Sequence, residues 1–421
     1  MKEAMCNINV EIEFPGAKVI KTEKDQRGNL LITVETTEDH VACRICNKKI
    51  YKRHGDDRER KLKHLPSFGT HTFIVYNPHR YICEDCQDNP TTTATPSWHS
   101  QTGSHTTEYE NHLLMELVNS TIVDVAIKEC ITEDAVLGVV TRRIASKVNW
   151  KNIKLLGVVG IDEISLKKGY KDFVTIITSR VDDKITLLAV LDGHKKAAIK
   201  RFLKEIPVHL RKTIISVCVD MYDGYINAVK EVFKDKVMVV VDRFHVAKLY
   251  RTELDKFRQK TLKQLKQELT AQQYDQIVGA TRILRRANEC LTEDEKKVVN
   301  LLFSYSPELM EAYSLAIKLT QTFNTHLSKK DAVVKFNEWI GLVNKSKLTC
   351  FNKFIKTLKK LKNEIANYFV NRHTSAFVEG LNNKIKVLKR RCYGIYDLKH
   401  FFQRLFLDLS GYELYAGKIE V

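Results

Sequence analysis

Apolar and polar positions follow two different periods along the chain, and the change of period divides it into zones. Between residues 153 and 245, short apolar runs alternate with segments of helical spacing, whereas residues 246–421 carry helical spacing almost throughout. Residues 88–107 are rich in Thr, Ser and Pro and show no hydrophobic period, which indicates a linker. The pattern therefore predicts an α/β segment followed by a long helical one.

Five apolar runs predict the strands of the α/β segment. The first three predict an antiparallel meander, with Asp182 and Asp183 in a tight turn between the second and the third. The last two are continuous Val and Ile runs flanked by helical segments, which is typical of parallel strands buried on both faces. The five runs are Leu155–Ile161, Phe173–Val181, Ile185–Leu191, Ile214–Val219 and Val237–Val241. The order β-β-β-α-β-α-β is that of an α/β ribonuclease-H-like fold, which we expect over residues 151–245.

Residues 108–150 show helical spacing in two short segments and one longer one. The longer segment, Thr132–Val148, begins with a threonine followed by two acids, which favour the positive end of a helix dipole. Short helices joined by a turn predict a helix-turn-helix domain, whose second helix would present Arg142, Arg143 and Lys147 to DNA. A three-helix spacer with a solvated basic end fits the same pattern.

The net charge adds a class of partner to this picture. The 421 residues include 69 Lys and Arg against 51 Asp and Glu, which gives a formal charge of +18. This excess predicts a polyanionic partner, either nucleic acid or an anionic membrane surface. The composition, 43% hydrophobic and 29% charged, is that of a globular protein and excludes general disorder. No apolar run approaches about 18 residues and the N-terminus lacks the order of a signal peptide, so we expect a cytoplasmic protein.

Four of the ten cysteines form two CxxC pairs, Cys43 with Cys46 and Cys83 with Cys86, separated by 36 residues. In a reducing compartment such pairs indicate metal ligands, and four thiolates are the tetrahedral ligand set of one structural Zn²⁺. The strand-like run His71–Ile82 would return the chain to the first pair. We expect a zinc-ribbon head over residues 1–87. Two unrelated buried pairs, or a redox motif, are the alternatives.

Three predicted strands end in an aspartate: Asp162, Asp220 and Asp242. Sites in α/β sheets form beyond the carboxyl ends of strands, and the first and fourth strands of this fold are neighbours. Asp162 and Asp220 are therefore expected to converge. Carboxylates at close range repel one another unless a divalent cation lies between them, and oxygen ligands select Mg²⁺ or Mn²⁺. The alternative is that each aspartate only caps the helix that follows it.

A helical segment near the C-terminus, residues 373–391, offers a third carboxylate in Glu379. This glutamate lies off the apolar stripe of the helix, and Asn382, Asn383 and Lys386 follow on its own side. An acid beside amides and a lysine suits a metal ligand next to a phosphate backbone. A solvated surface glutamate is the alternative.

Two basic runs of the chain contain no acidic residue, and the second of them begins five residues after Glu379. Residues 345–362 hold seven lysines opposite an apolar helical face, and residues 384–391 hold five basic residues. A charge run is usually a solvated helix face, but so many like charges without neutralising neighbours favour phosphate binding. We expect a DNA track here, and the membrane alternative loses its support. The candidate DNA-binding residues beside Glu379 are Asn383, Lys384, Lys386, Lys389, Arg390 and Arg391.

Four segments of the chain closely resemble bacterial insertion-sequence transposases of the ISL3 family. They are GIDEISLKKG (160–169), VCVDMYDGY (217–225), VVVDRFHVAKL (239–249) and SAFVEGLNNKIKVLKRRCYGI (375–395). The two cysteine pairs and the helix-turn-helix zone fit the same family, so the resemblance extends from about Cys43 to about Leu407. It implies a DDE transposase with a zinc-ribbon and helix-turn-helix head.

The resemblance also implies roles for individual residues. Asp162, Asp220 and Glu379 would be the catalytic triad and would hold two Mg²⁺ or Mn²⁺ ions per active site. Asp242 and His245 would support that site without binding metal. The long gap between Asp220 and Glu379 implies a helical insertion, which matches residues 246–370, and residues 371–421 would be C-terminal core helices that carry the catalytic glutamate.

The expected function is transposition. The head would bind the terminal inverted repeats of an insertion sequence, and the core would cleave the ends and join the 3′-hydroxyls to target DNA. Two ends call for two active sites, so we expect a homodimer or larger assembly on DNA, in the bacterial cytoplasm and associated with the nucleoid, with no membrane partner. The alternatives are a non-catalytic DNA-binding regulator derived from a transposase and a structure-selective nuclease of the same fold.

Overall fold

The computed structural model describes residues 14–100, 102–165, 173–286, 291–374, 376–392 and 397–416, without the side chains of residues 376–379. The chain divides into two compact units, which are described separately below. The first consists of Met1–Ser146 together with Gln403–Val421, and the second of Lys147–Phe402. The expected C-terminal segment 371–421 is therefore divided between the two units.

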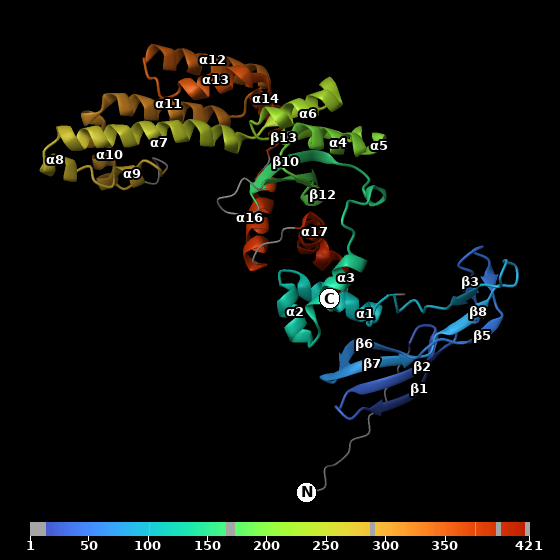
Figure 1. The fold of residues 1–421 in the computed structure, drawn as a ribbon. Helices are drawn as coiled ribbons and strands as arrows, with labels where there is room; N and C mark the ends of the chain where they lie inside the picture. The colour runs from blue at the N-terminus through green and yellow to red at the C-terminus, as the bar shows by residue number, and fades with distance from the viewer. Residues whose placement is uncertain are drawn as a thin grey trace, which may run out of the picture. The chain divides into compact units, whose positions relative to one another are not determined.

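A five-stranded sheet of order β12-β11-β10-β13-β14 is the centre of the second unit (Figure 1). β10, β11 and β12 form the predicted antiparallel meander, and β13 and β14 continue the sheet in parallel with β10. The strands are β10 (Gly157–Ser165), β11 (Phe173–Val181), β12 (Lys184–Asp192), β13 (Ile214–Val219) and β14 (Met238–Val241). The predicted mixed α/β architecture is confirmed, with one difference. β10 continues beyond Asp162, because β11 pairs with it as far as Ser165.

Helices cover both faces of this sheet. α4 (Lys196–Glu205) and α6 (Asp223–Phe233) lie side by side and contact β12, β13 and β14, while α16 (Ala376–Arg391) contacts β10. The cover explains why the consecutive residues Val217–Val219 are all fully buried. An unbroken apolar run is what a strand with two buried faces requires. A short helix, α5 (Val208–Arg211), precedes β13.

The part of the chain after β14 is helical in its described residues, as the periodicity predicts. α7 (Arg243–Glu268) begins directly after β14. The helices that follow are α8 (Ala271–Asp275), α9 (Ala280–Ile283), α10 (Glu293–Tyr305), α11 (Pro307–Asn324), α12 (Lys329–Lys345), α13 (Asn352–Lys360), α14 (Lys362–Ala366) and α15 (Tyr368–Asn371). In α13 the apolar face is buried and the lysines are exposed, so this basic run has the expected amphipathic form.

The first unit begins with strands that the sequence pattern only partly predicts. A four-stranded sheet has the order β1-β2-β7-β6, and two small sheets, β3-β4 and β5-β8-β9, carry the cysteine pairs. The strands are β1 (Ala17–Lys24), β2 (Leu30–Thr36), β3 (Val41–Ala42), β4 (Lys49–Ile50), β5 (Arg53–Asp56), β6 (Arg60–Ser67), β7 (Thr70–Tyr76), β8 (His79–Ile82) and β9 (Thr91–Thr93). The prediction of one strand over His71–Ile82 is wrong. The run divides at Pro78, which has no N–H for a strand ladder, and its halves join different sheets.

Three helices follow, each capped at its start by a threonine side chain. They are α1 (Thr107–Leu117), α2 (Ile122–Glu129) and α3 (Glu133–Arg143). α3 starts as predicted but ends five residues early. Gln403, at the start of the C-terminal segment of this unit, donates from Nε2 to the carbonyl of Ile144 at 2.6 Å, so a side chain satisfies this carbonyl where the helix would have continued. Lys147 therefore lies outside the helix on which it was predicted.

The segment expected to be a linker, 88–107, is packed against the rest of the unit. It contains β9, it buries Trp98 to 2% exposure, and the N–H of Thr106 bonds the carbonyl of Lys63 in β6 at 3.0 Å. Its aromatic and histidine side chains meet the neighbouring sheet, since Tyr76 Oη lies 2.7 Å from His99 Nδ1. Composition alone did not indicate this, because the few large side chains of the segment follow no period.

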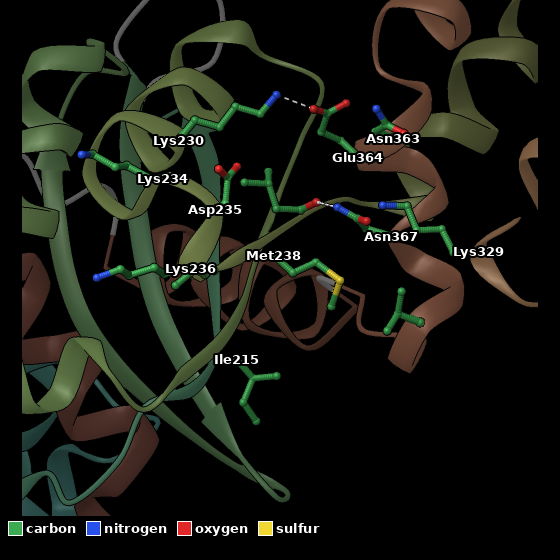
Figure 2. Close-up of a pocket in the computed structure, with 13 residues that line it drawn as sticks. Ile215, Lys230, Lys234, Asp235, Lys236, Met238, Lys329, Asn363, Glu364 and Asn367 are labelled. Atoms are coloured by element: carbon green, nitrogen blue, oxygen red, sulfur yellow. Dashed lines mark hydrogen bonds and ion pairs between the residues drawn. The ribbon is translucent and has the colours of Figure 1, made fainter.

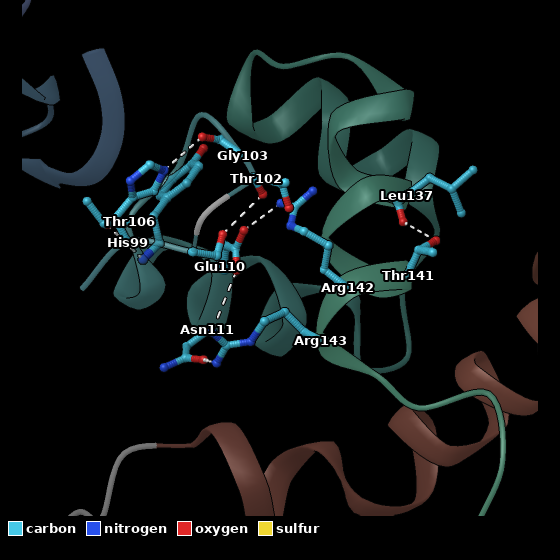
Figure 3. A network of polar contacts seen from close by, with 12 residues as sticks. His99, Thr102, Gly103, Thr106, Glu110, Asn111, Leu137, Thr141, Arg142 and Arg143 are labelled. Carbon is cyan, nitrogen blue, oxygen red and sulfur yellow. Dashed lines mark hydrogen bonds and ion pairs between the residues drawn. The ribbon is translucent and has the colours of Figure 1, made fainter. Parts of the chain in front are cut away.

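A buried carboxylate connects α1 to α3. Glu110 is fully buried, and its Oε1 accepts from Arg142 at 2.5 Å while Arg143 lies 3.6 Å from its Oε2 (Figure 3). Arg143 also donates to the side chain of Asn111 at 2.7 Å. The two arginines that the sequence assigns to DNA thus also hold the helical unit together.

Replacing Glu110 by Ala should destabilise the first unit by about 3 kcal/mol or more, because two guanidinium groups would lose their buried partner. Urea unfolding of the full chain, with amide exchange of residues 107–143 as the local readout, measures the change. The exposed Glu108, two residues earlier in the same helix, is the matched control, and its replacement by Ala should shift stability by less than about 0.5 kcal/mol. Equal effects at both positions would contradict a structural role for the pair.

Candidate functional site

Strand register places three aspartates at one edge of the five-stranded sheet. Ile161 of β10 pairs with Val219 of β13, and Val219 pairs with Val241 of β14. The residues that directly follow Ile161, Val219 and Val241 in the chain are Asp162, Asp220 and Asp242, respectively. Neighbouring strands are about 4.8 Å apart, so carboxylates at equivalent positions of adjacent strands come within reach of one ion.

Asp162 lies inside β10 and not at its end. Its Oδ1 accepts from the N–H of Glu163 at 2.8 Å, and its Oδ2 accepts from Nδ2 of Asn382 in α16 at 2.5 Å. The parallel pairing with β13 ends at Ile161, whereas the pairing with β11 continues. Asp162 is therefore the first residue of β10 that no longer pairs with β13, and its carboxylate contacts α16 instead.

Asp220 does not cap α6, whose N-cap is Tyr222 without a side-chain cap bond, but it forms a local bond just before that helix and also belongs to the cluster. Its Oδ1 accepts from the N–H of Tyr222 at 2.8 Å. Burial raises the pKa of Asp220, and the nearby charge of Asp162 adds to this, while the N–H of Tyr222 and His245 act in the opposite direction. A carboxylate whose ionised form is disfavoured in this way gains most from a cation placed beside it.

Asp242 and His245 form a supporting pair at the start of α7. Asp242 is 2% exposed, caps the helix by accepting from the N–H of Phe244 at 3.3 Å, and lies 3.3 Å from His245 Nδ1. This contact raises the pKa of His245, as do the charges of Asp162 and Asp220, against the effect of burial. The pair thus places the His245 ring close enough to Asp162 and Asp220 for their charges to act on it.

The third predicted carboxylate, Glu379, belongs to α16, but its side chain lies outside the described residues. Further along the same helix, Leu381, Ile385 and Leu388 are buried, which confirms the predicted apolar stripe. Asn382 is nearly buried and faces β10, whereas its neighbour Asn383 is exposed.

The basic residues of α16 differ in what they contact. Lys389 donates from Nζ to the carbonyl of Ser165 at the end of β10, and burial lowers its pKa. Lys386 and Arg390 are exposed, Lys384 and Arg391 are half-buried, and Arg390 donates from Nε to the carbonyl of Lys386 at 3.3 Å. Lys389 is therefore anchored beside the aspartates, and Lys386 and Arg390 extend toward solvent.

A pocket of about 310 Å³ opens at this edge of the sheet, between β10, the start of α7 and α16. Its polar lining consists of Asp162, Glu163, Ser165, Asp242, His245, Lys248, Asn382 and Lys386. An acidic floor with lysines at the rim can bind a divalent cation together with a phosphate group. The position of the pocket agrees with the rule that α/β sites form beyond the carboxyl ends of strands.

Glu163 belongs to this pocket, and the sequence analysis did not select it. It lies 3.1 Å from His194 Nδ1, and burial raises its pKa, as do the charges of Asp220 and Asp162. The signal in the sequence was its place directly after Asp162. Strand alternation predicts that neighbours point to opposite faces, so the usual argument excluded it from the same cluster.

The four cysteines of the head form one cluster. The sulfur atoms lie 3.9 Å apart for Cys43 and Cys86, 3.8 Å for Cys46 and Cys83, and 3.7 Å for Cys83 and Cys86, and all four are within 4.8 Å of one another. A tetrahedron with metal–sulfur bonds of about 2.3 Å has edges of about 3.8 Å, so the cluster fits a zinc ribbon. The N–H groups of Cys46 and Ile45 lower the pKa of the Cys43 thiol to about 6, which favours the thiolate that a metal requires.

The 36 residues between the two cysteine pairs have a structural explanation. Strands β6 and β7 of the four-stranded sheet are inserted between the first pair, at the β3–β4 turn, and the second, which follows β8. Among the described residues no histidine is part of this cluster, and the nearby His79 instead lies 2.8 Å from Asp56.

Comparisons with known proteins show which family the chain resembles. A family model of ISL3-type DDE proteins, described as "Transposase", matches residues 159–405. The transposase of insertion sequence element IS1001 from Bordetella parapertussis is 24% identical over 396 residues, which cover 93% of this chain and 94% of that protein. The transposase of IS1557 from Mycobacterium tuberculosis is 22% identical over 273 residues, 60% of each chain. In the part of the chain that the structure describes, no helix is both long and apolar enough to cross a membrane.

Proposed function

Since the chain belongs to the ISL3 family of DDE transposases, we propose that it binds the terminal inverted repeats of an insertion sequence, cleaves the ends of the element and joins the freed 3′-hydroxyls to target DNA. The observation that carries this proposal is the register that brings Asp162, Asp220 and Asp242 to one edge of the sheet. The strand order, with its second strand antiparallel to the others, supports a ribonuclease-H-like core.

Asp162, Asp220 and Glu379 are the proposed ligands of two Mg²⁺ or Mn²⁺ ions. The residues present fit such ions, because the donors are oxygens and the pocket also contains the buried side-chain oxygen of Asn382 with no hydrogen-bond partner among the described residues. Glu379 precedes Asn382 by three residues, a spacing that places two helix positions on the same side. When bound, the ions supply activation of the attacking water or hydroxyl and stabilisation of the leaving oxygen.

The remaining residues of the pocket hold the ligands and the DNA. Asn382 and the N–H of Tyr222 fix the orientation of Asp162 and Asp220. Asp242 and His245 add a positively polarised ring at the back of the site without binding metal. Lys386, Lys389 and Arg390, with Asn383, Lys384 and Arg391 on the same helix, are proposed to bind phosphates of the DNA strand that enters the pocket.

The first unit is proposed to recognise the ends of the element. The four cysteines would hold one structural Zn²⁺, and α2 and α3 would form a helix-turn-helix with a three-residue turn, Cys130–Thr132. Arg142 and Arg143 keep about a quarter of each side chain exposed beside Glu110, so they suit phosphate contacts that position the helix better than base contacts. Lys147 lies beyond the helix and is proposed to contact the backbone only.

The proposal includes a homodimer or larger assembly on DNA, in a bacterial cytoplasm and near the nucleoid. A non-catalytic regulator would share the head but would not need the oxygen cluster at the sheet edge. A structure-selective nuclease would share the cluster and would cut without joining strands.

Replacing Asp220 or Glu379 by Ala should lower metal-dependent cleavage of a labelled end fragment more than about 100-fold, because each change removes a metal ligand. End binding, measured in the same preparations by mobility shift, should stay within about twofold. Asp183, a fully exposed carboxylate in the turn between β11 and β12, is the control, and its replacement by Ala should leave both readouts unchanged. Full cleavage by either variant would refute the assignment of the triad.

Removing the head metal should abolish specific end binding. Elemental analysis of the purified chain is expected to give one Zn²⁺ per chain, and replacing Cys46 by Ser should lower that content to near zero together with specific binding. The exposed Cys130, replaced by Ser, is the matched control and should retain both. A Cys46→Ser protein with full zinc content would rule out the four-thiolate site.

A further inference from the structure

Asn382 has a buried side chain whose single hydrogen bond satisfies only one of its two polar atoms. Only 8% of the residue is exposed, and its Nδ2 donates to Asp162 Oδ2 at 2.5 Å. Its Oδ1 is buried as well and has no hydrogen-bond partner among the described residues. A buried carbonyl oxygen without a partner is unfavourable, so a protein retains one where a further group completes the contact.

The direction of that oxygen follows from the bond that the amide already makes. Because Asp162 accepts from Nδ2, the planar amide holds Oδ1 on its other branch, and Asn382 lines the pocket together with Asp162, Asp242 and His245. The oxygen cannot pair with these carboxylates, which are acceptors. The pocket side chains that could donate are Lys248, Lys386, His245 and Ser165; the two lysines are exposed, and none of the four donates to this oxygen among the described residues. A hard cation is the partner that suits an amide oxygen next to carboxylates.

We propose that Asn382 Oδ1 completes the coordination of the divalent cation held by Asp162, so that the amide serves as donor to one ligand and is itself a ligand. The inference rests on the proposed function only in assuming a divalent cation at this edge of the sheet. Asn383, the next residue, is exposed, and Lys386 lies 3.4 Å from its side-chain oxygen. Two adjacent asparagines of α16 therefore have separate roles, one toward the metal and one toward solvent or DNA.

Binding of Mn²⁺ alone to the full-length protein tests the proposal without any measurement of cleavage. Titration followed by electron paramagnetic resonance should show Asn382→Ala binding Mn²⁺ at least tenfold more weakly than the parent protein. Asn383→Ala should bind it equally well. Parent affinity in Asn382→Ala would overturn the proposal.

A second variant separates a ligand from a residue that only orients Asp162. Asn382→Asp keeps an oxygen but cannot donate to Asp162 when ionised. If the oxygen is a ligand, this variant should bind Mn²⁺ at least as tightly as the parent protein, and Mn²⁺ should raise its unfolding temperature more. Loss of affinity equal to that of the Ala variant would assign Asn382 to orientation alone and refute the ligand role. If the parent protein itself failed to bind Mn²⁺, the proposed catalytic metal site would fall, and the ligand role with it.

A different observation concerns the opposite end of the same sheet. A groove of about 970 Å³ lies at the amino ends of β13 and β14 (Figure 2). Both strands run from this groove toward the aspartates. The groove therefore lies at the amino ends of the strands, and the aspartates lie at their carboxyl ends. Four lysines from α6, the turn after it and α12 line the groove against two acids: Lys230, Lys234, Lys236 and Lys329 against Asp235 and Glu364.

The acids do not neutralise this lysine set. Glu364 is nearly buried and pairs with Lys230, which leaves three lysines against Asp235 (Figure 2). Lys234 also has backbone angles of φ 54° and ψ −132°, a combination that glycine adopts easily and other residues rarely do. A glycine at this position would relieve the backbone, whereas the lysine adds a positive charge to the groove.

The geometry points to the groove as a phosphate-binding surface for a second segment of duplex DNA, separate from the strand at the aspartates. This inference rests on the proposed function for the identity of the polyanion. Duplex DNA suits an open groove with lysines on both walls, because phosphates need only positive charge and no base contact.

The variant Lys234→Gly tests the groove as a DNA-binding surface, because we expect it to leave the fold at least as stable while it weakens DNA binding. Relief of the backbone should keep or raise the unfolding temperature, while binding of a duplex of random sequence, measured without divalent metal, should weaken about threefold or more. The plot of log affinity against log salt should lose about 0.9 from its slope for each phosphate contact removed. Lys204→Gln, an exposed lysine at the end of α4, is the control and should leave the slope unchanged.

An unchanged slope in Lys234→Gly, and in the double variant with Lys236→Gln, would overturn the groove as a DNA surface while leaving the triad assignment intact. Failure of the parent protein to bind any duplex would instead refute the proposed function, and the groove with it.

Discussion

The register of the parallel strands is the constraint on which the rest of the site depends. Backbone hydrogen bonds pair Ile161 with Val219 and Val219 with Val241, so each strand reaches its aspartate at the same edge of the sheet. A slip of one residue would carry a carboxylate into a row of buried Val and Ile side chains, at the cost of removing a charge from water. The apolar strands thus fix the positions of the polar residues that follow them.

Bringing like charges together is unfavourable, and the structure offsets this with two N–H donors from the starts of helices and one side-chain donor from within α16. Asp220 accepts from the N–H of Tyr222, Asp242 from the N–H of Phe244, and Asp162 from the side chain of Asn382. Of the three aspartates only Asp242 caps a helix, and the two proposed metal ligands, Asp162 and Asp220, do not. A hydrogen bond to one carboxylate oxygen orients the group, and the proposed cations would account for the remaining charge.

Much of this could be predicted from the sequence, and the failures have identifiable causes. The strands, the amphipathic α13 and the cysteine cluster follow from local spacing, and the structure contains them. The run His71–Ile82 was wrongly joined because Pro78 was given too little weight. The sequence also does not show that Glu110, 32 residues before Arg142, is buried beside Arg142 and Arg143, whose contact with DNA stays a prediction. The contact of Asn382 with Asp162 was not predicted, since helical spacing alone does not resolve two adjacent asparagines, and DNA binding by Asn383 stays a prediction.

The sequence by itself determined the type and order of the elements, the residues that end or follow each strand, and the chemistry of the candidate ligands. These depend on periodicity and on the identity of single residues, which act over a few positions of the chain. Only the tertiary structure decided which distant groups meet: Asn382 with Asp162 across 220 residues, and Cys86 with Cys43 across 43. Such contacts depend on how each helix is rotated against its sheet, and that rotation is set by the packing of the whole core and is not encoded in any one segment.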